Sequence, residues 1–234
     1  LDMTAVEPVR GNSFVGTTTG IYRVDPGSET DPNWVQLPTD SADPWYDIAV
    51  SGLAWVEPLL FAAAADQEPG TAADQITVDR GIIVWYADPA TGEETWMSLT
   101  KETHGLPSND VHDVAAAGQT LYAGTSSGLA AATLNEADPA TTSFSLVPLG
   151  SELPEDQPRV NQVHVAEEAV YVATHTGLWY SPDAGASWDV VCRGSGLPAD
   201  DPAISTDEVL SVSTLGDSVF VGMPAVGIVE LVWQ

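Results

Sequence analysis

Basic side chains are scarce in this chain. Its 234 residues include 6 Lys and Arg against 34 Asp and Glu, which gives a formal net charge of −28. Phosphate backbones and anionic membrane surfaces both attract clustered Lys and Arg, and this sequence contains no such cluster. Nucleic acid is therefore excluded as a partner. The acidic side chains are expected to form a solvated surface that resists aggregation, and adaptation to high salt would give the same composition.

Cysteine and long apolar runs are lacking as well. Cys192 is the only cysteine, so no disulfide can form within the chain. The longest apolar stretch, 59–65, is far shorter than the roughly 18 residues of a membrane helix, so we expect a buried strand there and no membrane span. Residues 1–10 already contain three charged side chains and do not resemble a signal segment. If the protein is exported, we expect its signal to have been removed before residue 1.

A sustained helical period is also missing, and a repeat of another kind takes its place. In each copy an apolar run leads into a short Thr- or Ser-rich turn, a glycine and a second apolar run. The copies span 13–22, 121–129, 170–179 and, more loosely, 219–228, and a degenerate copy joins 59–62 to 81–84 across a polar insertion at 66–79. The glycines after the turns recur about every 50 residues, which is the period of a propeller blade; they are Gly20, Gly81, Gly128, Gly177 and Gly227.

Each copy predicts a β-hairpin with one more strand on either side. Alternating stretches precede the hairpins at 111–117, 160–166 and 209–214, and short Trp- or Phe-bearing strands follow them at 34–37, 96–99, 144–147 and 188–191. Four-stranded sheets repeated around an axis are the propeller solution to unprotected strand edges. We therefore predict an all-β fold, a β-propeller of about five four-stranded blades in a single domain, 1–234. The expected blades are 1–43, 44–104, 105–157, 158–204 and 205–234.

The last predicted blade is incomplete, because the sequence ends just after its third strand. An apolar edge strand recruits other chains unless charge or proline blunts it, and here only one charged side chain does so. We expect this edge to contact a partner chain by strand addition. The alternatives are a three-stranded blade that needs no partner and a lost terminal segment. The expected contact residues are Ile228, Glu230, Leu231 and Trp233.

One segment carries a family resemblance. The run from Ser181 to Trp188 reads S-P-D-A-G-A-S-W and resembles the Asp-box (BNR) repeat of sialidase, sortilin-type and photosystem-assembly propellers. The stretches 105–111 and 122–129 are similar to the two-component-regulator propeller repeat. Both resemblances imply a fold and no activity. In the Asp-box we expect the aspartate to cap its own turn and the tryptophan to be largely buried between blades; the structural residues are Ser181, Asp183, Gly185, Ser187 and Trp188.

Polar residues at or near the innermost strands are the candidates for a binding site. Converging carboxylates there would suit sugar chemistry, and histidines on adjacent blades would suit a metal ion, although H-x-H and H-E-x-x-H spacings are absent. His112 and His164 are expected one residue out of register. We predict no catalytic residue and leave a metal open. The candidates for one mouth of the central channel are Asp47, Asp110, His112, Asn161, His164 and Asp207.

The acidic loops contain oxygen ligands but lack the regular spacing of a dedicated calcium loop. They lie at 28–31, 66–68, 88–94 and 136–139. We therefore predict no cofactor, with Ca²⁺ as the one ion for which these loops offer ligands.

The sequence favours a non-enzymatic, extracytoplasmic propeller in the periplasm or on the cell surface. Its predicted role is binding or scaffolding through protein–protein interaction, as an accessory subunit of a larger surface assembly. The alternative is a carbohydrate-binding lectin or a glycoside hydrolase-like propeller. A sialidase is disfavoured because its substrate carboxylate needs clustered arginines, whereas the five arginines here are scattered along the chain.

Overall fold

The account of the structure rests on a computed structural model. It describes residues 3–9, 12–28, 31–38, 40, 42–43, 45–64, 81–88, 91–150, 156–191, 208–224 and 226–232. The polar insertion at 66–79, Cys192, Asp207 and Trp233 lie outside these residues.

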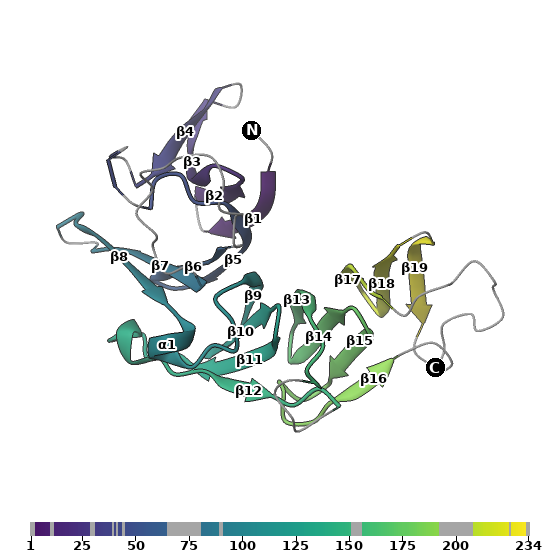
Figure 1. Ribbon diagram of the computed structural model, residues 1–234. Helices are drawn as coiled ribbons and strands as arrows, with labels where there is room; N and C mark the ends of the chain where they lie inside the picture. Colours follow the sequence, from purple (N-terminus) through teal and green to yellow (C-terminus); the bar gives the residue numbers. More distant parts are fainter. Residues whose placement is uncertain are drawn as a thin grey trace, which may run out of the picture.

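Five antiparallel sheets account for almost all the regular structure, as expected for an all-β chain (Figure 1). The first sheet contains β1 (Met3–Val9), β2 (Asn12–Thr17), β3 (Gly20–Ser28) and β4 (Asp31–Leu37), and the second β5 (Val50–Val56), β6 (Leu59–Ala64), β7 (Gly81–Ala87) and β8 (Glu94–Leu99). The third contains β9 (Val111–Ala117), β10 (Thr120–Thr125), β11 (Gly128–Thr133) and β12 (Ser145–Val147), and the fourth β13 (Val160–Ala166), β14 (Ala169–Thr174), β15 (Gly177–Ser181) and β16 (Asp189–Val191). The fifth contains β17 (Ser211–Leu215), β18 (Ser218–Met223) and β19 (Gly227–Val232).

Within the described residues, helical structure is confined to two short segments. They are α1 (Lys101–His104) and a 3₁₀ turn, Pro139–Thr141. In each sheet the strands follow one another in sequence order, so every sheet is a simple meander. The division into blades at 43, 104, 157 and 204 stays a prediction.

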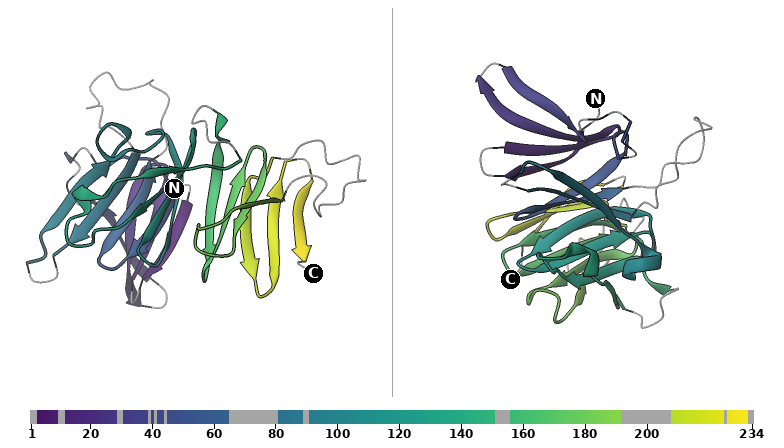
Figure 2. Two further views of the ribbon diagram at one scale, coloured as in Figure 1. Left: turned by 90° about the horizontal axis from the view of Figure 1, so that it is seen from below. Right: turned by 90° about the vertical axis from the view of Figure 1, so that its left-hand side faces the viewer.

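The sheets stack face to face along an arc. The first strands of successive sheets contact one another, in the order β1, β5, β9, β13 and β17. The first and fifth sheets stand at opposite ends of the arc (Figure 1), and Figure 2 shows the fifth sheet, in yellow, beyond the fourth. The inner strands thus share one side of the molecule.

The second, third and fourth sheets each use both of their faces for packing. In β7, Ile82 and Val84 join a cluster with the third sheet, whereas the alternate residues Ile83 and Trp85 join a cluster with the first sheet. We call the face turned toward the next sheet the forward face and the opposite one the backward face. Full burial of one such side chain contributes about 1.5–3 kcal/mol, so these layers dominate the stability of the fold.

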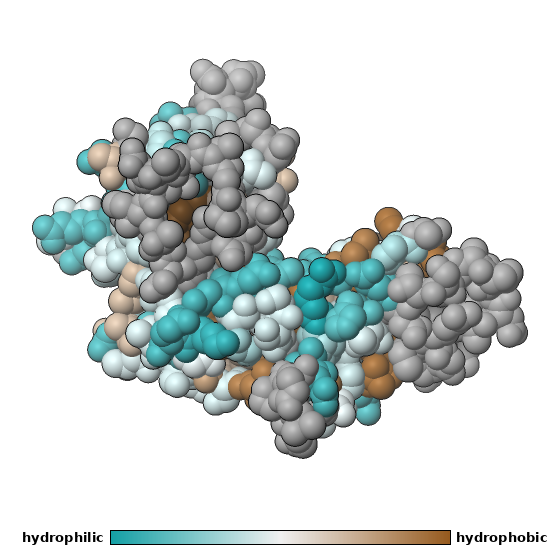
Figure 3. Space-filling model, viewed as in Figure 1, coloured by the Kyte–Doolittle hydropathy of each residue, from teal (hydrophilic) through white to brown (hydrophobic). Residues whose placement is uncertain are grey.

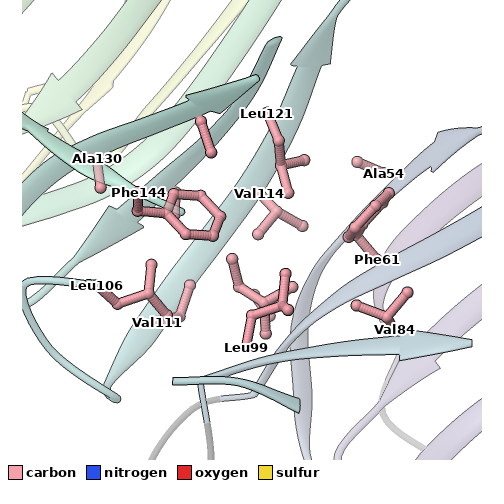
Figure 4. Close-up of a cluster of buried hydrophobic side chains, with 14 of the residues drawn as sticks. Ala54, Phe61, Val84, Leu99, Leu106, Val111, Val114, Leu121, Ala130 and Phe144 are labelled. Carbon is pink, nitrogen blue, oxygen red and sulfur yellow. The ribbon is translucent and has the colours of Figure 1, made fainter. Parts of the chain in front are cut away.

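The layer between the second and third sheets shows how the faces meet (Figure 4). Phe61 and Leu99 from the second sheet lie against Val111, Val114 and Leu121 from the third, and all five are buried. Comparable layers join the first sheet to the second, the third to the fourth and the fourth to the fifth.

A buried threonine closes the second hairpin of three sheets. Its hydroxyl donates to the carbonyl of the glycine three residues later and accepts the N–H two residues later. The donated bonds are Thr17 to Gly20 at 2.9 Å, Thr125 to Gly128 at 2.8 Å and Thr174 to Gly177 at 2.8 Å. The glycines have φ between 114° and 142°, a region that only glycine enters readily. The backbone conformation of this turn therefore favours glycine at all three positions.

Replacing Thr125 with Val keeps the shape of this side chain and removes both hydrogen bonds. We expect a loss of about 1–3 kcal/mol in the free energy of unfolding, because the carbonyl of Gly128 loses its partner in a buried turn. Urea denaturation measures this loss. Thr125→Ser should retain most of the stability, and Thr133→Val, at an exposed position of the same hairpin, should change it by less than about 0.5 kcal/mol. Equal effects of the two valine substitutions would contradict this role for the turn hydroxyl.

Candidate functional site

The inner strands of all five sheets line one cavity of ≈ 540 Å³. We call it the inner cavity. Cavities of this size accommodate small ligands, so it is the first place to look for a binding site. Its polar lining residues are Glu7, Ser51, His112, Asp113, Asn161, Gln162, His164 and Ser211.

A β-bulge near the start of each of the first four inner strands, β1, β5, β9 and β13, redirects a residue there. The register shifts at Ser51, between Val50 and Gly52, and at Asn161, between Val160 and Gln162. His112 occupies the same position in β9, between the paired residues Val111 and Asp113. A bulge leaves one residue outside the ladder and redirects its side chain.

The two predicted histidines therefore do not occupy neighbouring register positions. His112 corresponds to Asn161, whereas His164 pairs with Tyr171 further along the next inner strand. The expected offset of one residue is wrong: counted from the equivalent residues Val111 and Val160, the two histidines lie three residues apart.

Polar side chains of the inner cavity bond the sheets to one another. In each case a bulged residue or its successor reaches the backbone of the next sheet. Ser51 Oγ donates to Val111 O at 3.2 Å, Asn161 Nδ2 donates to Val209 O at 2.7 Å, Asp113 Oδ2 accepts from Val163 N at 2.9 Å, and Gln162 Oε1 accepts from Val212 N at 2.7 Å. These groups hold the arc together, and the bonds occupy the atoms that a ligand would otherwise contact.

Asp113 is the carboxylate at the centre of this arrangement. Its second oxygen accepts the N–H of Val114 at 2.9 Å. Burial raises the pKa of this carboxyl to about 7, against the opposing effect of the two N–H bonds. Gly52 in the preceding sheet makes room for it, because a Cβ at that position would clash with Asp113. Asp113 was not among the predicted carboxylates, because those lie at or before the starts of the inner strands and Asp113 lies within one.

The two cavity histidines have different surroundings. His112 Nε2 lies 3.2 Å from Asp110 Oδ2, and both side chains are partly exposed. His164 Nε2 lies 2.9 Å from Thr214 Oγ1 on the fifth sheet. Burial lowers the pKa of His164, so this ring is neutral at pH 7.

Two of the predicted carboxylates lie outside the lining of the inner cavity. Asp47 is exposed in the turn before β5, and neither it nor Asp110 is a lining residue. The carboxylates that do line it are Glu7, whose pKa burial raises, and Asp113. Within the described part of the chain, no group of three or more His, Cys, Asp or Glu residues could hold a metal ion. Calcium binding stays a prediction.

The Asp-box segment forms a tight hydrogen-bonded turn after β15. Asp183 Oδ1 accepts the N–H of Ser187 at 2.8 Å, and Asp183 Oδ2 accepts its hydroxyl at 2.7 Å. The Ser187 hydroxyl and N–H are the main causes that lower the pKa of Asp183. Ser181 Oγ accepts the N–H of Gly185 at 2.8 Å. This is the geometry of an aspartate that caps its own turn.

This turn also contacts the third sheet. The hydroxyl of Tyr122 donates to Ala184 O at 2.7 Å, and Trp188 packs against the layer between the third and fourth sheets. Trp188 is partly buried against this layer, and its indole N–H donates to Gly185 O at 3.1 Å.

The predicted partner edge has side chains on both faces of β19. Ile228 is exposed, and exposed Glu230 accepts a hydrogen bond from Ser218 Oγ at 2.6 Å. Leu231 points the other way and is buried in the layer against the fourth sheet. Other large apolar side chains are exposed as well, and the described set is Met3, Val6, Trp34, Val190, Leu210, Leu215 and Ile228.

The raised pKa of Asp113 predicts how stability depends on pH. The folded-state pKa of about 7 lies above the unfolded value of about 3.9, so the contribution of this group is full below pH 4 and is lost as the pH rises through 7. The gain on acidification is at most about 1.4 kcal/mol per pH unit. In Asp113→Asn this component should vanish, which urea unfolding across this pH range measures. Asp47→Asn, at an exposed turn, should follow the wild type; parallel curves for Asp113→Asn and wild type would contradict the assignment.

No protein-family model matches the chain, and no curated protein matches it either. Solved structures do resemble it. Virginiamycin B lyase from Staphylococcus aureus has a TM-score of 0.61 at 9% identity, covering 99% of this chain and 66% of its own. PorZ, a bacterial surface component of the type-IX secretion system of Porphyromonas gingivalis, has 0.54 at 14%, covering 98% and 38%. The WD40 β-propeller domain of Doa1 has 0.52 at 10%, covering 94% and 61%.

These likenesses concern architecture only. The chain spans between about a third and two thirds of the length of these three structures. Within the described residues, no helix has the length and apolar character needed to cross a membrane. The five stacked sheets and the shared architecture together show a β-propeller fold.

Proposed function

We propose that this chain is a non-enzymatic propeller that binds protein, with each of its five sheets acting as one blade. The observation that carries the proposal is the set of large apolar side chains exposed on the sheets. Met3, Val6 and Trp34 lie on the first sheet and Leu215 and Ile228 on the fifth, and apolar groups that share an exposed face mark protein interaction sites. The inner cavity supports the same reading, because its Ser, Asp, Asn and Gln side chains bond the backbone of neighbouring sheets.

A location outside the cytoplasm is part of this proposal. PorZ, which shares the architecture, is described as a surface component of a secretion system. A chain with 34 acidic side chains keeps a soluble surface wherever apolar side chains do not interrupt it. We infer an accessory or scaffold role in a surface assembly, with the Asp-box as a structural element of the fourth blade.

Carbohydrate binding is the second candidate. Trp55 lines the inner cavity together with Glu7, and an aromatic face beside a carboxylate suits a sugar ring. Trp55 also stacks on Phe14, with ring centroids 5.6 Å apart, so part of its surface is already used by the core. A sugar would contact the same cavity side as His112.

Affinity capture with the tagged chain from the surface fraction of its source separates the two candidates. Wild type and His112→Ala should retain the same protein, whereas the double variant Met3→Asp/Ile228→Asp should lose it, because Met3 and Ile228 are exposed apolar residues outside the cavity lining and His112 lines the cavity. A glycan array run with the same variants tests the alternative. Saturable glycan binding that His112→Ala abolishes, without protein capture, would overturn the proposal.

A further inference from the structure

The exposed apolar side chains of the first sheet occupy positions that are buried elsewhere. Met3 and Val6 in β1 are 64% and 59% exposed. Their cross-strand partners place them at the two positions where each later inner strand packs on the sheet before it. The corresponding residues are all buried: Val50 and Leu53, Val111 and Val114, Val160 and Val163, and Val209 and Val212.

Trp34 in β4 belongs to the same face. It pairs with Val24, four residues after Gly20, just as Trp96 pairs with Trp85, four residues after Gly81. Trp96 packs in the layer toward the preceding sheet. Trp34 is 44% exposed, and the ring of Tyr22 lies edge-on to it with centroids 6.4 Å apart. Val15, which pairs with Val6 on the same face, is buried, so the backward face of the first sheet is uncovered at β1 and β4 rather than throughout.

The forward face of the fifth sheet shows the complementary pattern. Ile228 directly follows Gly227 and is 79% exposed. The residues that directly follow the equivalent glycines are buried against the next sheet: Ile21, Ile82, Leu129 and Leu178.

The inner strand of the fifth sheet adds two more uncovered side chains. Leu215 ends β17 and is 75% exposed, whereas Val56, Ala117 and Ala166, which end the preceding inner strands, pack in forward layers. Leu210 is 48% exposed and occupies the position from which Ser51 and Asn161 reach the next sheet. Hydrophobic surface, in brown, lies over this sheet in Figure 3.

We propose that the backward face of the first sheet of one copy packs on the forward face of the fifth sheet of a second copy, head to tail. This inference rests on the proposed protein-binding function and names the partner. Every junction inside the molecule joins a backward face to a forward face. One molecule carries one uncovered face of each kind, at opposite ends of its arc (Figure 1). A second copy therefore continues an interface that the chain already forms four times.

The packing at the internal junctions supports this contact between two copies. At two internal junctions the valine that opens an inner strand lies over a glycine of the preceding sheet, since a Cβ on that glycine would come within 2.6 Å of Val50 or 2.5 Å of Val160. Gly222 in β18 occupies the equivalent position in the fifth sheet. It faces the side where Met3 of the second copy arrives. Such a head-to-tail contact closes into a ring or continues as a string of copies.

Charge sets the conditions under which the contact forms. The strand residues described on the backward face of the first sheet are uncharged, and Glu230 is the acidic strand residue on the forward face of the fifth. The remaining repulsion comes from the net charge of −28 on each copy and is screened by salt. Association therefore strengthens as the salt concentration rises.

Analytical ultracentrifugation of the purified chain tests this contact. The mass should rise with protein concentration, and more steeply at about 1 M salt, where the Debye length falls to about 3 Å. Val6→Asp and Ile228→Asp should each be monomeric, because each loses one face. An equimolar mixture of the two should form dimers and nothing larger, since each retains the face that the other lacks. Val190→Asp, at an exposed apolar position on β16, should associate like the wild type.

A monomer at every concentration and salt, or a mixture of the two variants that stays monomeric, would overturn the inference. Circular dichroism of each variant confirms that its sheets have formed. If the chain is monomeric but still captures another protein through Met3 and Ile228, the partner is not a second copy, and the proposed protein-binding function stands without this inference.

Discussion

The packing of one sheet face on the next is the interaction on which the rest of the structure depends. A sheet with apolar side chains on both faces cannot satisfy them alone, so it is stable only between two others. β7 shows the constraint in one strand, because Ile82 and Ile83 are both fully buried and point to opposite neighbours. The meander within each sheet, the closed turns and the arc all serve this stacking.

The polar residues of the inner strands have a role that follows from this packing. Where inner strands converge, their bulges leave backbone N–H and C=O groups that need partners in a low-dielectric setting. Side chains from the neighbouring sheet supply them, as Asn161 does for Val209 O and Asp113 for Val163 N. Both oxygens of this carboxyl, whose pKa burial raises to about 7, accept backbone N–H groups, so Asp113 has a structural use in the inner strands.

The sequence predicted what depends on local chemistry. Strands β9 and β13 begin and end where the alternating pattern placed them, and the recurring glycines Gly20, Gly128 and Gly177 have positive φ. Features that arise from contacts between strands were not predictable in this way. The bulge at His112 depends on pairing with the neighbouring strand, and the enclosure of Asp113 depends on packing against the neighbouring sheets, and alternation along one strand contains no such information.

The two ends of the arc offer more free energy for association than the inner cavity does. Leaving Met3, Val6, Trp34, Leu215 and Ile228 in water forgoes burial at about 25 cal/mol per Å² of apolar surface, whereas the cavity groups already have their hydrogen bonds. A ligand in the cavity would compete with bonds that hold the sheets together. A sheet laid on either end face displaces only water and meets side chains already arranged as a packing layer, so the free energy available for association lies at the ends.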